Sequence, residues 1–280
     1  MRMVDTALIA DEVARMCVQS NKALPLDIVE RLQSAFENET SELAKKLLSS
    51  MMENITLAEK HSIPVCQDTG MVVVFLDIGQ EVQLSGALPE DAVNEGIRRA
   101  YTGDFLRCSV AADPVRRGNT GDNTPAIVHT RIVAGDKVTL TVAPKGCGSE
   151  NMSGHKMLKP TASAEDIIAE VAAVAEAAGG NPCPPMVIGV GIGGNFEQSA
   201  ILAKRALCRP LNVPNPDLFY AGLEKRMLSA VNALDIGVQG FGGATTALGV
   251  NIEWAPTHIA GLPLAVNIGC YVTRHMTAVI

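Results

Sequence analysis

The chain has 280 residues, of which 47% are hydrophobic and 19% are charged, and its formal net charge is −7. This composition excludes a disordered chain and provides enough apolar material for one large domain or two modest ones. The acidic balance argues against a nucleic-acid-binding or anionic-membrane surface, which would need clustered basic residues.

The first 60 residues predict a helical amino-terminal layer. Apolar side chains recur at three- and four-residue spacing over residues 5–19 and 26–37. A third helical pattern follows and ends before Pro64, because proline breaks a helix.

Strand and helix patterns alternate after this layer. MVVVFLDI at residues 71–78 is a near-continuous apolar run, typical of a strand buried on both faces. Residues 126–133 and 137–143 predict two further strands, and Gly135-Asp136 between them predicts that they form a hairpin. The remaining predictions are helices over 89–101, 164–178, 196–207 and 217–232, the last capped by Asn215-Pro216, and a strand over 186–190.

The stretch from Ile236 to Thr273 is unusually neutral, since Glu253 is its only formally charged residue. Such a stretch is either deep core or a surface that a partner covers. We find no fixed repeat, no apolar run of about 20 residues that could span a membrane, and no signal-peptide pattern, so we expect a cytoplasmic protein. The elements predict one α/β domain over residues 1–280 (mixed α+β), with the helical layer packed on a mixed β-sheet core that further helices surround.

Four short segments carry side chains that are poor choices for packing alone. IPVCQDTGMV places Cys66, Gln67 and Asp68 in a turn before a buried strand, although a turn held by its own hydrogen bonds would look the same. Each of the other three segments also has a purely structural explanation: a solvated hairpin end for the first, a rigid turn around a small residue for the second, and a core histidine for the third. They are APKGCGSENMSGHK at 143–156, NPCPPMVIGVGIGG at 181–194 and THIAGLPLAVNIGCYVTRH at 257–275.

The segment at 181–194 also contains a possible dinucleotide fingerprint. Gly189, Gly191 and Gly194 have the spacing of the glycines that approach a pyrophosphate between a strand and a helix. However, the region about 20 residues further on is a proline-rich loop with no strand that ends in Asp or Glu. Nicotinamide binding is therefore kept only as an alternative.

The seven cysteines are spread along the chain, and their odd number and wide spacing favour reduced thiols over a disulfide scaffold. The closest pair, Cys183 and Cys208, is 25 residues apart, which disfavours a zinc ribbon. Cys66, Cys183 and Cys270 each lie in a turn rich in Pro or Gly beside an apolar strand, whereas Cys17 and Cys208 fall in helical patterns typical of core. Three thiolates would leave one iron of a cubane cluster open, and such an iron can act as a Lewis acid.

Six motifs, taken in chain order, resemble those of the iron–sulfur hydro-lyases of the class I fumarase and L-tartrate dehydratase group. They are PVCQDTG, LRCSV, GNTGDNTPA, PKGCGSEN, CPP and VNIGC. The resemblance is to the α subunit and covers roughly residues 10 to 275. It implies a 4Fe–4S cluster held by Cys66, Cys183 and Cys270.

The resemblance also implies roles for other side chains. Cys147 stands where many family members have glycine, so it is left out of the ligand set. Asp68 could hold a proton for the departing oxygen, and the Arg107 guanidinium matches a carboxylate bidentately. The implied set comprises catalytic Asp68 and His258 and substrate-binding Gln67, Arg107 and Gly148.

The implied reaction adds water to a small dicarboxylate, converting fumarate reversibly to L-malate, a step of the tricarboxylic acid cycle. L-tartrate dehydration is the alternative, and the PKGCGSEN form favours the fumarase branch. This chain offers no base for the carbon-bound proton, so the resemblance implies that a β subunit supplies it in an α2β2 hetero-oligomer. A non-catalytic partner-binding subunit, whose cysteines only fill the core, is a second alternative.

Overall fold

The computed structural model describes residues 2–280, which fold into two compact units. Unit 1 takes in the chain up to Pro25, Ile55–Cys147 and Arg274–Ile280, and unit 2 takes in Leu26–Asn54 and Gly148–Thr273. Each unit has its own hydrophobic core. The single domain expected from the sequence stays a prediction, because a domain can contain two compact units that each have a core.

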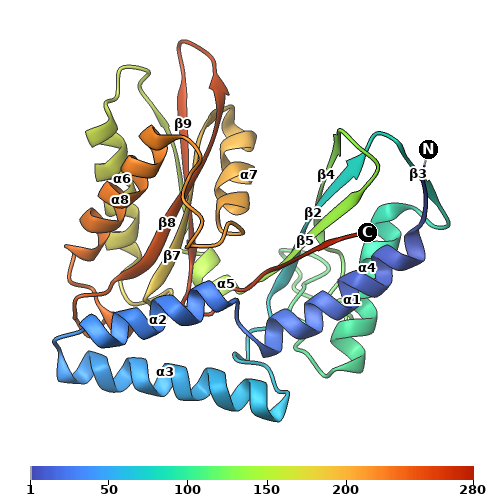
Figure 1. Ribbon diagram of the computed structural model, residues 1–280, viewed down its shortest axis with the longest axis horizontal. Coiled ribbons are helices and arrows are strands. Elements are labelled where there is room, and N and C mark those ends of the chain that lie inside the picture. Colours follow the sequence, from blue (N-terminus) through green and yellow to red (C-terminus); the bar gives the residue numbers. More distant parts are fainter. Residues whose placement is uncertain (1) are drawn as a thin grey trace. The chain divides into compact units, whose positions relative to one another are not determined.

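Unit 1 contains a four-stranded mixed sheet, a separate pair of strands, two complete helices and the end of a third (Figure 1). The sheet order is β10-β5-β2-β4, and β1 pairs with β3 in parallel. The elements are β1 (Arg2–Asp5), α1 (Thr6–Lys22), β2 (Met71–Gly79), β3 (Val82–Ser85), α4 (Pro89–Gly103), β4 (Ile127–Val133), β5 (Val138–Lys145) and β10 (Met276–Val279).

The predicted hairpin between the two strands that flank Gly135 is wrong. Strands β4 and β5 do not pair with each other, because β2 lies between them, parallel to β4 and antiparallel to β5. The apolar run of β2 is buried along most of its length, so a central place with a neighbour on each side suits it better than an edge.

The core of unit 1 lies between the sheet and the helices α1 and α4. Alternate β2 residues Val72, Val74 and Leu76 join this core, as the two-residue period of a strand requires. On the opposite face, Phe75 stacks on His129 with ring centroids 5.2 Å apart. The prediction that this strand is buried on both faces is therefore confirmed.

Unit 2 contains a second mixed sheet, with the order β6-β9-β7-β8, and helices on both of its faces. Strand β7 runs parallel to β8 and antiparallel to β9. The elements are α2 (Leu26–Asn38), α5 (Cys147–Glu150, which starts at the last residue of this segment of unit 1), β6 (Gly154–Leu158), α6 (Ala164–Ala178), β7 (Met186–Gly194), α7 (Phe196–Ala206), α8 (Leu218–Asn232), η1 (Val238–Gly240), β8 (Ala247–Thr257) and β9 (Leu262–Gly269), and α3 (Glu42–His61) contributes to both units.

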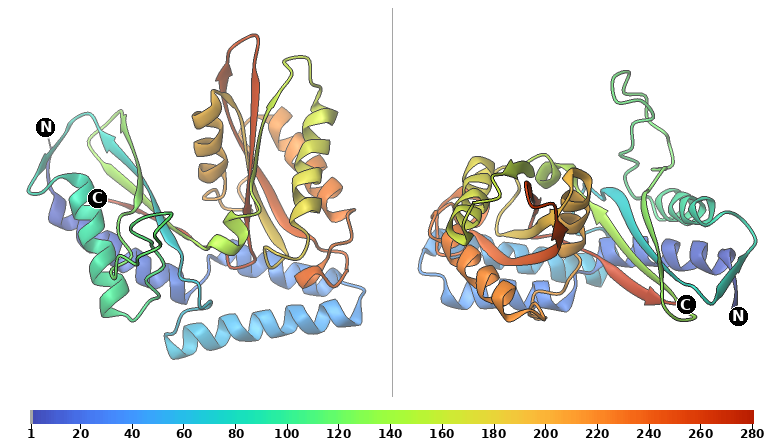
Figure 2. Two further views of the ribbon diagram at one scale, coloured as in Figure 1. Left: turned by 180° about the vertical axis from the view of Figure 1, so that it is seen from behind. Right: turned by 90° about the horizontal axis from the view of Figure 1, so that it is seen from above.

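Helices α6 and α8 cover one face of this sheet, and α7 covers the other (Figure 1). Two further views show the same layers (Figure 2). The neutral stretch supplies β8 and β9, whose residues Val250, Ile252, Val266 and Ile268 are buried in the core. Mixed sheets with helices on their faces confirm the α/β fold class.

The limits of helices α6 and α8 follow closely from their capping residues. Helix α6 starts at a capping box between Ser163 and Asp166, and it ends at Gly179 as predicted. Helix α8 starts one residue later than expected, because Asp217 is its N-cap, and Asn215 accepts a hydrogen bond from the Asp217 amide. No helix among residues 2–280 is long and apolar enough to cross a membrane.

Candidate functional site

In unit 1, the turn Cys66–Gly70 leads directly into β2. The Asp68 carboxylate accepts hydrogen bonds from the amides of Gly70 and Cys147, each at 3.0 Å. Gly70 has a φ of 79°, and a Cβ there would lie 2.7 Å from the backbone nitrogen of Lys145. These contacts restrict the turn at Gly70 and orient the Asp68 carboxylate.

Arg107 lies beside this turn because Thr69 holds its backbone. The Thr69 hydroxyl accepts a hydrogen bond from the Arg107 amide at 2.9 Å and donates one to the Arg107 carbonyl oxygen at 3.2 Å. Arg107 lies near the start of the irregular segment between α4 and β4, and it is exposed. This segment can be followed in Figure 2. Gln67 is exposed as well. Unit 1 therefore brings Cys66, Gln67, Asp68 and Arg107 together.

Two further residues support the turn, and sequence analysis missed both. The Tyr101 hydroxyl donates a hydrogen bond to the Thr69 carbonyl oxygen at 2.6 Å, and burial raises the pKa of Tyr101. The buried guanidinium of Arg274 donates one to the Asp68 carbonyl oxygen. A sequence signal for Arg274 does exist, since it is the first basic residue after the neutral stretch.

In unit 2, Cys183 and Cys270 lie at the same end of the sheet. Cys183 precedes β7 and Cys270 follows its antiparallel neighbour β9. The Tyr271 amide donates a hydrogen bond to the Cys183 carbonyl oxygen at 3.4 Å. Cys183 also has a φ of 54°, a left-handed conformation that is uncommon for residues other than glycine and that is found often at functional sites.

Gly148 is tied to this same end of the sheet through Glu150. The Glu150 carboxylate accepts hydrogen bonds from the Lys204 ammonium and from the Asn267 side chain. The Ser153 hydroxyl accepts one from the Ile268 amide at 3.0 Å, two residues before Cys270. A cavity of about 240 Å³ is lined by residues of this network, among them Glu150, Lys204 and Asn267.

His258 does not lie at the end of the unit 2 sheet that carries Cys183 and Cys270. It follows the end of β8 and precedes β9, whereas Cys270 follows β9. An eight-residue strand spans about 26 Å, so the length of β9 separates His258 from Cys270. His258 is exposed at the tip, where its Nδ1 atom accepts a hydrogen bond from the Ala260 amide. These contacts describe where His258 lies but do not test its catalytic role, which stays a prediction.

The environments of the cysteines separate core thiols from possible ligands. Burial raises the pKa of Cys17 to about 12, and it likewise raises the pKa of Cys208 to about 12. A metal ligand must be a thiolate, so these two are poor candidates. Cys66 and Cys270 are half-buried, as Cys208 also is, and Cys183 is exposed. The raised pKa, and not the exposed fraction, therefore distinguishes Cys208 from the predicted ligands. None of the seven thiols forms a disulfide.

The three predicted ligands do not all belong to one unit. Cys66 lies in unit 1, and Cys183 and Cys270 lie in unit 2. Within residues 2–280, neither unit by itself groups three His, Cys, Asp or Glu side chains into a metal site. The ligand set, and the roles of Asp68, Gln67, Arg107 and Gly148, stay predictions.

The glycines of the possible dinucleotide fingerprint serve packing between β7 and α7. A Cβ at Gly189 would lie 2.2 Å from the Ala203 carbonyl oxygen, and one at Gly191 would lie 1.9 Å from the Ser199 carbonyl oxygen. Both glycines are inside the strand, with the helix backbone against them. This close packing accounts for both glycines without a nucleotide.

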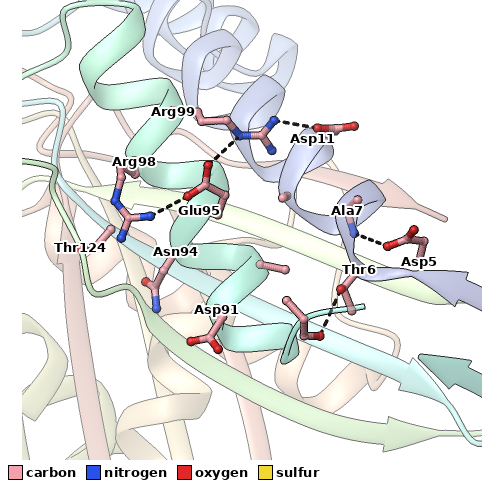
Figure 3. Close-up of a pocket in the computed structure, with 13 residues that line it drawn as sticks. Asp5, Thr6, Ala7, Asp11, Asp91, Asn94, Glu95, Arg98, Arg99 and Thr124 are labelled. Carbon is pink, nitrogen blue, oxygen red and sulfur yellow. Dashed lines mark hydrogen bonds and ion pairs between the residues drawn. The ribbon is translucent and has the colours of Figure 1, made fainter. Parts of the chain in front are cut away.

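A larger cavity, of about 680 Å³, lies in unit 1 between the start of α1 and α4 (Figure 3). Its charged side chains pair largely with one another, as Arg99 does with Asp11 and Arg98 does with Glu95. None of the predicted site residues lines it. This cavity is therefore separate from the candidate site.

Comparisons with known proteins agree with the motifs. The family model of fumarate hydratase (fumerase) matches residues 10–279. A protein of Methanocaldococcus jannaschii, provisionally named L(+)-tartrate dehydratase subunit alpha, is 38% identical over 271 residues, which are 95% of each chain.

L(+)-tartrate dehydratase subunit alpha of Escherichia coli K12 is 30% identical, over 96% of this chain and 89% of its own. The protein of the same name from Shigella sonnei has the same identity and coverage. These relatives are similar along nearly their whole length, and the family match covers most of the chain. The chain therefore belongs to the fumarate hydratase family of hydro-lyases.

Proposed function

We propose that the chain is the α subunit of a two-component iron–sulfur hydro-lyase that interconverts fumarate and L-malate. Family membership supports the reaction class, and the names of the relatives support the division into two chains. The observation that carries the proposal is the hydrogen bond from the Tyr271 amide to the Cys183 carbonyl oxygen. It joins the backbone of Cys183 to that of the residue after Cys270 at one end of a sheet, although the two cysteines are distant in sequence.

The proposed ligands of a 4Fe–4S cluster are Cys66, Cys183 and Cys270. Three thiols in turns, outside the core and outside any disulfide, fit the donor set of such a cluster. A buried donor without a partner, Nε of Arg274, lies in the residue that holds the Cys66 turn through Asp68. When bound, the cluster would supply an iron without a protein ligand as a Lewis acid for substrate oxygen.

Substrate binding is assigned to Arg107, Gln67 and Gly148. Arg107 binds a carboxylate of the dicarboxylate bidentately, and the paired hydrogen bonds to Thr69 fix its backbone. Gln67 offers an exposed amide beside Cys66. At Gly148, an added Cβ would meet nothing within 4 Å among the described residues, so substrate can approach the backbone there.

Asp68 is assigned the proton of the departing oxygen. Two amide donors orient its carboxylate, so the proton is held at a defined position. His258, in the exposed loop between β8 and β9, is the second catalytic residue of the proposal. The base that removes the carbon-bound proton is assigned to a β subunit, with which the chain forms an α2β2 assembly in the cytoplasm.

L-tartrate dehydration is the second candidate function. The observation that favours it is the name of the curated relatives, which are tartrate dehydratase α subunits. L-malate and L-tartrate differ by one hydroxyl group, and one polar contact can discriminate between such substrates. Comparing kcat/KM for L-malate, fumarate and L-tartrate on the same αβ enzyme therefore decides between them.

The test of the proposal is anaerobic reconstitution of the αβ complex with iron and sulfide. We expect broad cluster absorbance and hydro-lyase activity, and we expect Cys66→Ser, Cys183→Ser and Cys270→Ser each to abolish both. Cys108→Ser is the matched control, because the Cys108 thiol already donates to the Gly121 carbonyl oxygen. Absorbance that survives all three substitutions would refute this ligand set, and a wild-type complex that takes up no iron would favour a partner-binding subunit.

A further inference from the structure

We propose that Arg274 is the buried counter-charge of the thiolate-bound cluster and that it positions the turn that carries Cys66. The proposal rests on the proposed function, because it assumes that a cluster is bound. It adds a residue that the family motifs do not include. Three observations in unit 1 support it, namely the burial of Arg274, its unused donor and its bond to Asp68.

Arg274 is a charged side chain inside the protein. The residue is 4% exposed, and it forms no ion pair within the described part of unit 1. A buried charge without a counter-ion is costly, because the low-dielectric interior cannot replace water. A guanidinium in this position therefore indicates an anion that belongs to the assembled enzyme.

The hydrogen bonds of Arg274 indicate the same. One terminal nitrogen donates to the Asp68 carbonyl oxygen, which is a neutral acceptor. The Nε atom is buried and has no hydrogen-bond partner. The nearby Asp68 carboxylate is engaged with the amides of Gly70 and Cys147. Arg274 thus carries a positive charge whose one hydrogen bond goes to a neutral oxygen, and its Nε donor has no partner in the described residues.

The position of Arg274 in the chain relates it to the proposed ligands. Its partner Asp68 is two residues after Cys66, and Arg274 itself is four residues after Cys270. Three thiolates exceed the charge of a 2+ cluster core by one, so the bound group is an anion. Hydrogen bonds and positive charge near the cluster raise its reduction potential and stabilise the thiolates. A buried arginine supplies both.

Arg274 is distinguished from Arg107 by its burial. The Arg107 residue is exposed and only its backbone is fixed, as suits a side chain that meets a diffusing substrate. The Arg274 side chain is enclosed and holds the turn from within. We therefore assign the substrate carboxylate to Arg107 and the permanent anion to Arg274.

The test uses the reconstituted αβ enzyme with Arg274→Gln, Arg274→Lys and, as the control, Arg131→Gln. Arg131 is an arginine of the same unit that pairs with Asp77 at the surface. We expect Arg274→Gln to lower the midpoint potential of the cluster, measured by EPR-monitored titration, by about 59 mV, a tenfold change for a one-electron couple. Arg274→Lys should retain most of the potential, and Arg131→Gln should not change it.

Three outcomes would overturn the assignment. One is an equal potential in wild type and Arg274→Gln. Another is a rise in KM for the dicarboxylate without a change in potential, which would assign Arg274 to substrate. The third is a midpoint potential of the cluster in Arg274→Lys that is as low as in Arg274→Gln. If Arg274→Gln does not fold, the Lys variant and the rate of cluster loss in air provide the comparison, and we then expect cluster loss to be faster than in wild type. Wild type that binds no cluster would instead refute the proposed function itself.

Discussion

The Lys204 ammonium donates hydrogen bonds to both carboxylate oxygens of Glu150, which joins helix α7 to the short helix α5. Glu150 also accepts a hydrogen bond from Asn267 of β9 at 3.1 Å. The ion pair therefore links the segment that contains Gly148 to the strand that ends before Cys270. Its side chains are partly buried, with 14% of Lys204 and 37% of Glu150 exposed.

Lys204→Met is expected to lower the free energy of unfolding by about 2 kcal/mol, because it leaves the Glu150 carboxylate without its cation in a partly buried site. Urea denaturation measures the effect. Lys156→Met is the control, because Lys156 pairs with Glu170 at the surface and its side chain is 56% exposed. Surface ion pairs of this kind contribute less than about 1 kcal/mol to the free energy of unfolding. Equal losses in both variants would contradict a special role for the Lys204 pair.

Gly191→Ala is expected to destabilise the protein by about 3 kcal/mol or more, because the new Cβ would meet the Ser199 carbonyl oxygen of α7. Thermal and urea unfolding provide the measurement. At Gly222, inside α8, nothing lies within 4 Å of an added Cβ in the described structure, so Gly222→Ala should stabilise by about 0.5–1 kcal/mol. A neutral Gly191→Ala variant would reopen the dinucleotide interpretation.

Thr69→Val is expected to raise KM for the dicarboxylate several-fold while the cluster absorbance stays unchanged. The valine has nearly the same shape but loses both hydrogen bonds to the Arg107 backbone, so the guanidinium is less well placed. Steady-state kinetics on the αβ enzyme is the measurement. Thr141→Val, which removes an exposed hydroxyl pair with Thr277, should leave KM as it is.

Alkaline pH is expected to destabilise the protein partly through Cys17. Burial raises the pKa of this thiol from 9.0 to about 12. Its contribution is fully present below the unfolded-state pKa and is lost as pH rises from 9 towards 12, because only the unfolded chain ionises in that window. The expected loss near pH 10.5 is about 2 kcal/mol. Urea midpoints should fall less steeply with pH in Cys17→Ala than in wild type.

The sequence patterns predict the elements of this fold better than their pairing. The strand at 71–79 and the helix Ala164–Ala178 follow from local periodicity and capping. The pairing of β4 with β2 was not predicted, because the Gly135-Asp136 turn is a local signal and strand order depends on the packing of the whole sheet. Tertiary packing overrides the turn.

The candidate site shows the same limit. The turn contexts of Cys183 and Cys270 are visible in sequence, and strand pairing brings both to one end of a sheet. The separation of His258 from Cys270 depends on β9 being straight and eight residues long, which twelve residues of spacing alone do not reveal. Arg274 and Thr69 act through backbone atoms of distant residues. The neutral stretch before Arg274 draws attention to that residue, but no sequence pattern indicates either contact.

Strand β10 pairs with β5 of unit 1, although the whole of Gly148–Thr273 lies between these two strands in the chain. During synthesis on the ribosome, the first unit must therefore wait for its last strand until the second has emerged. Arg274 reaches Asp68 at that same late moment. A nascent chain that stalls before residue 274 would thus expose an unfinished sheet edge, a target for proteolytic clearance.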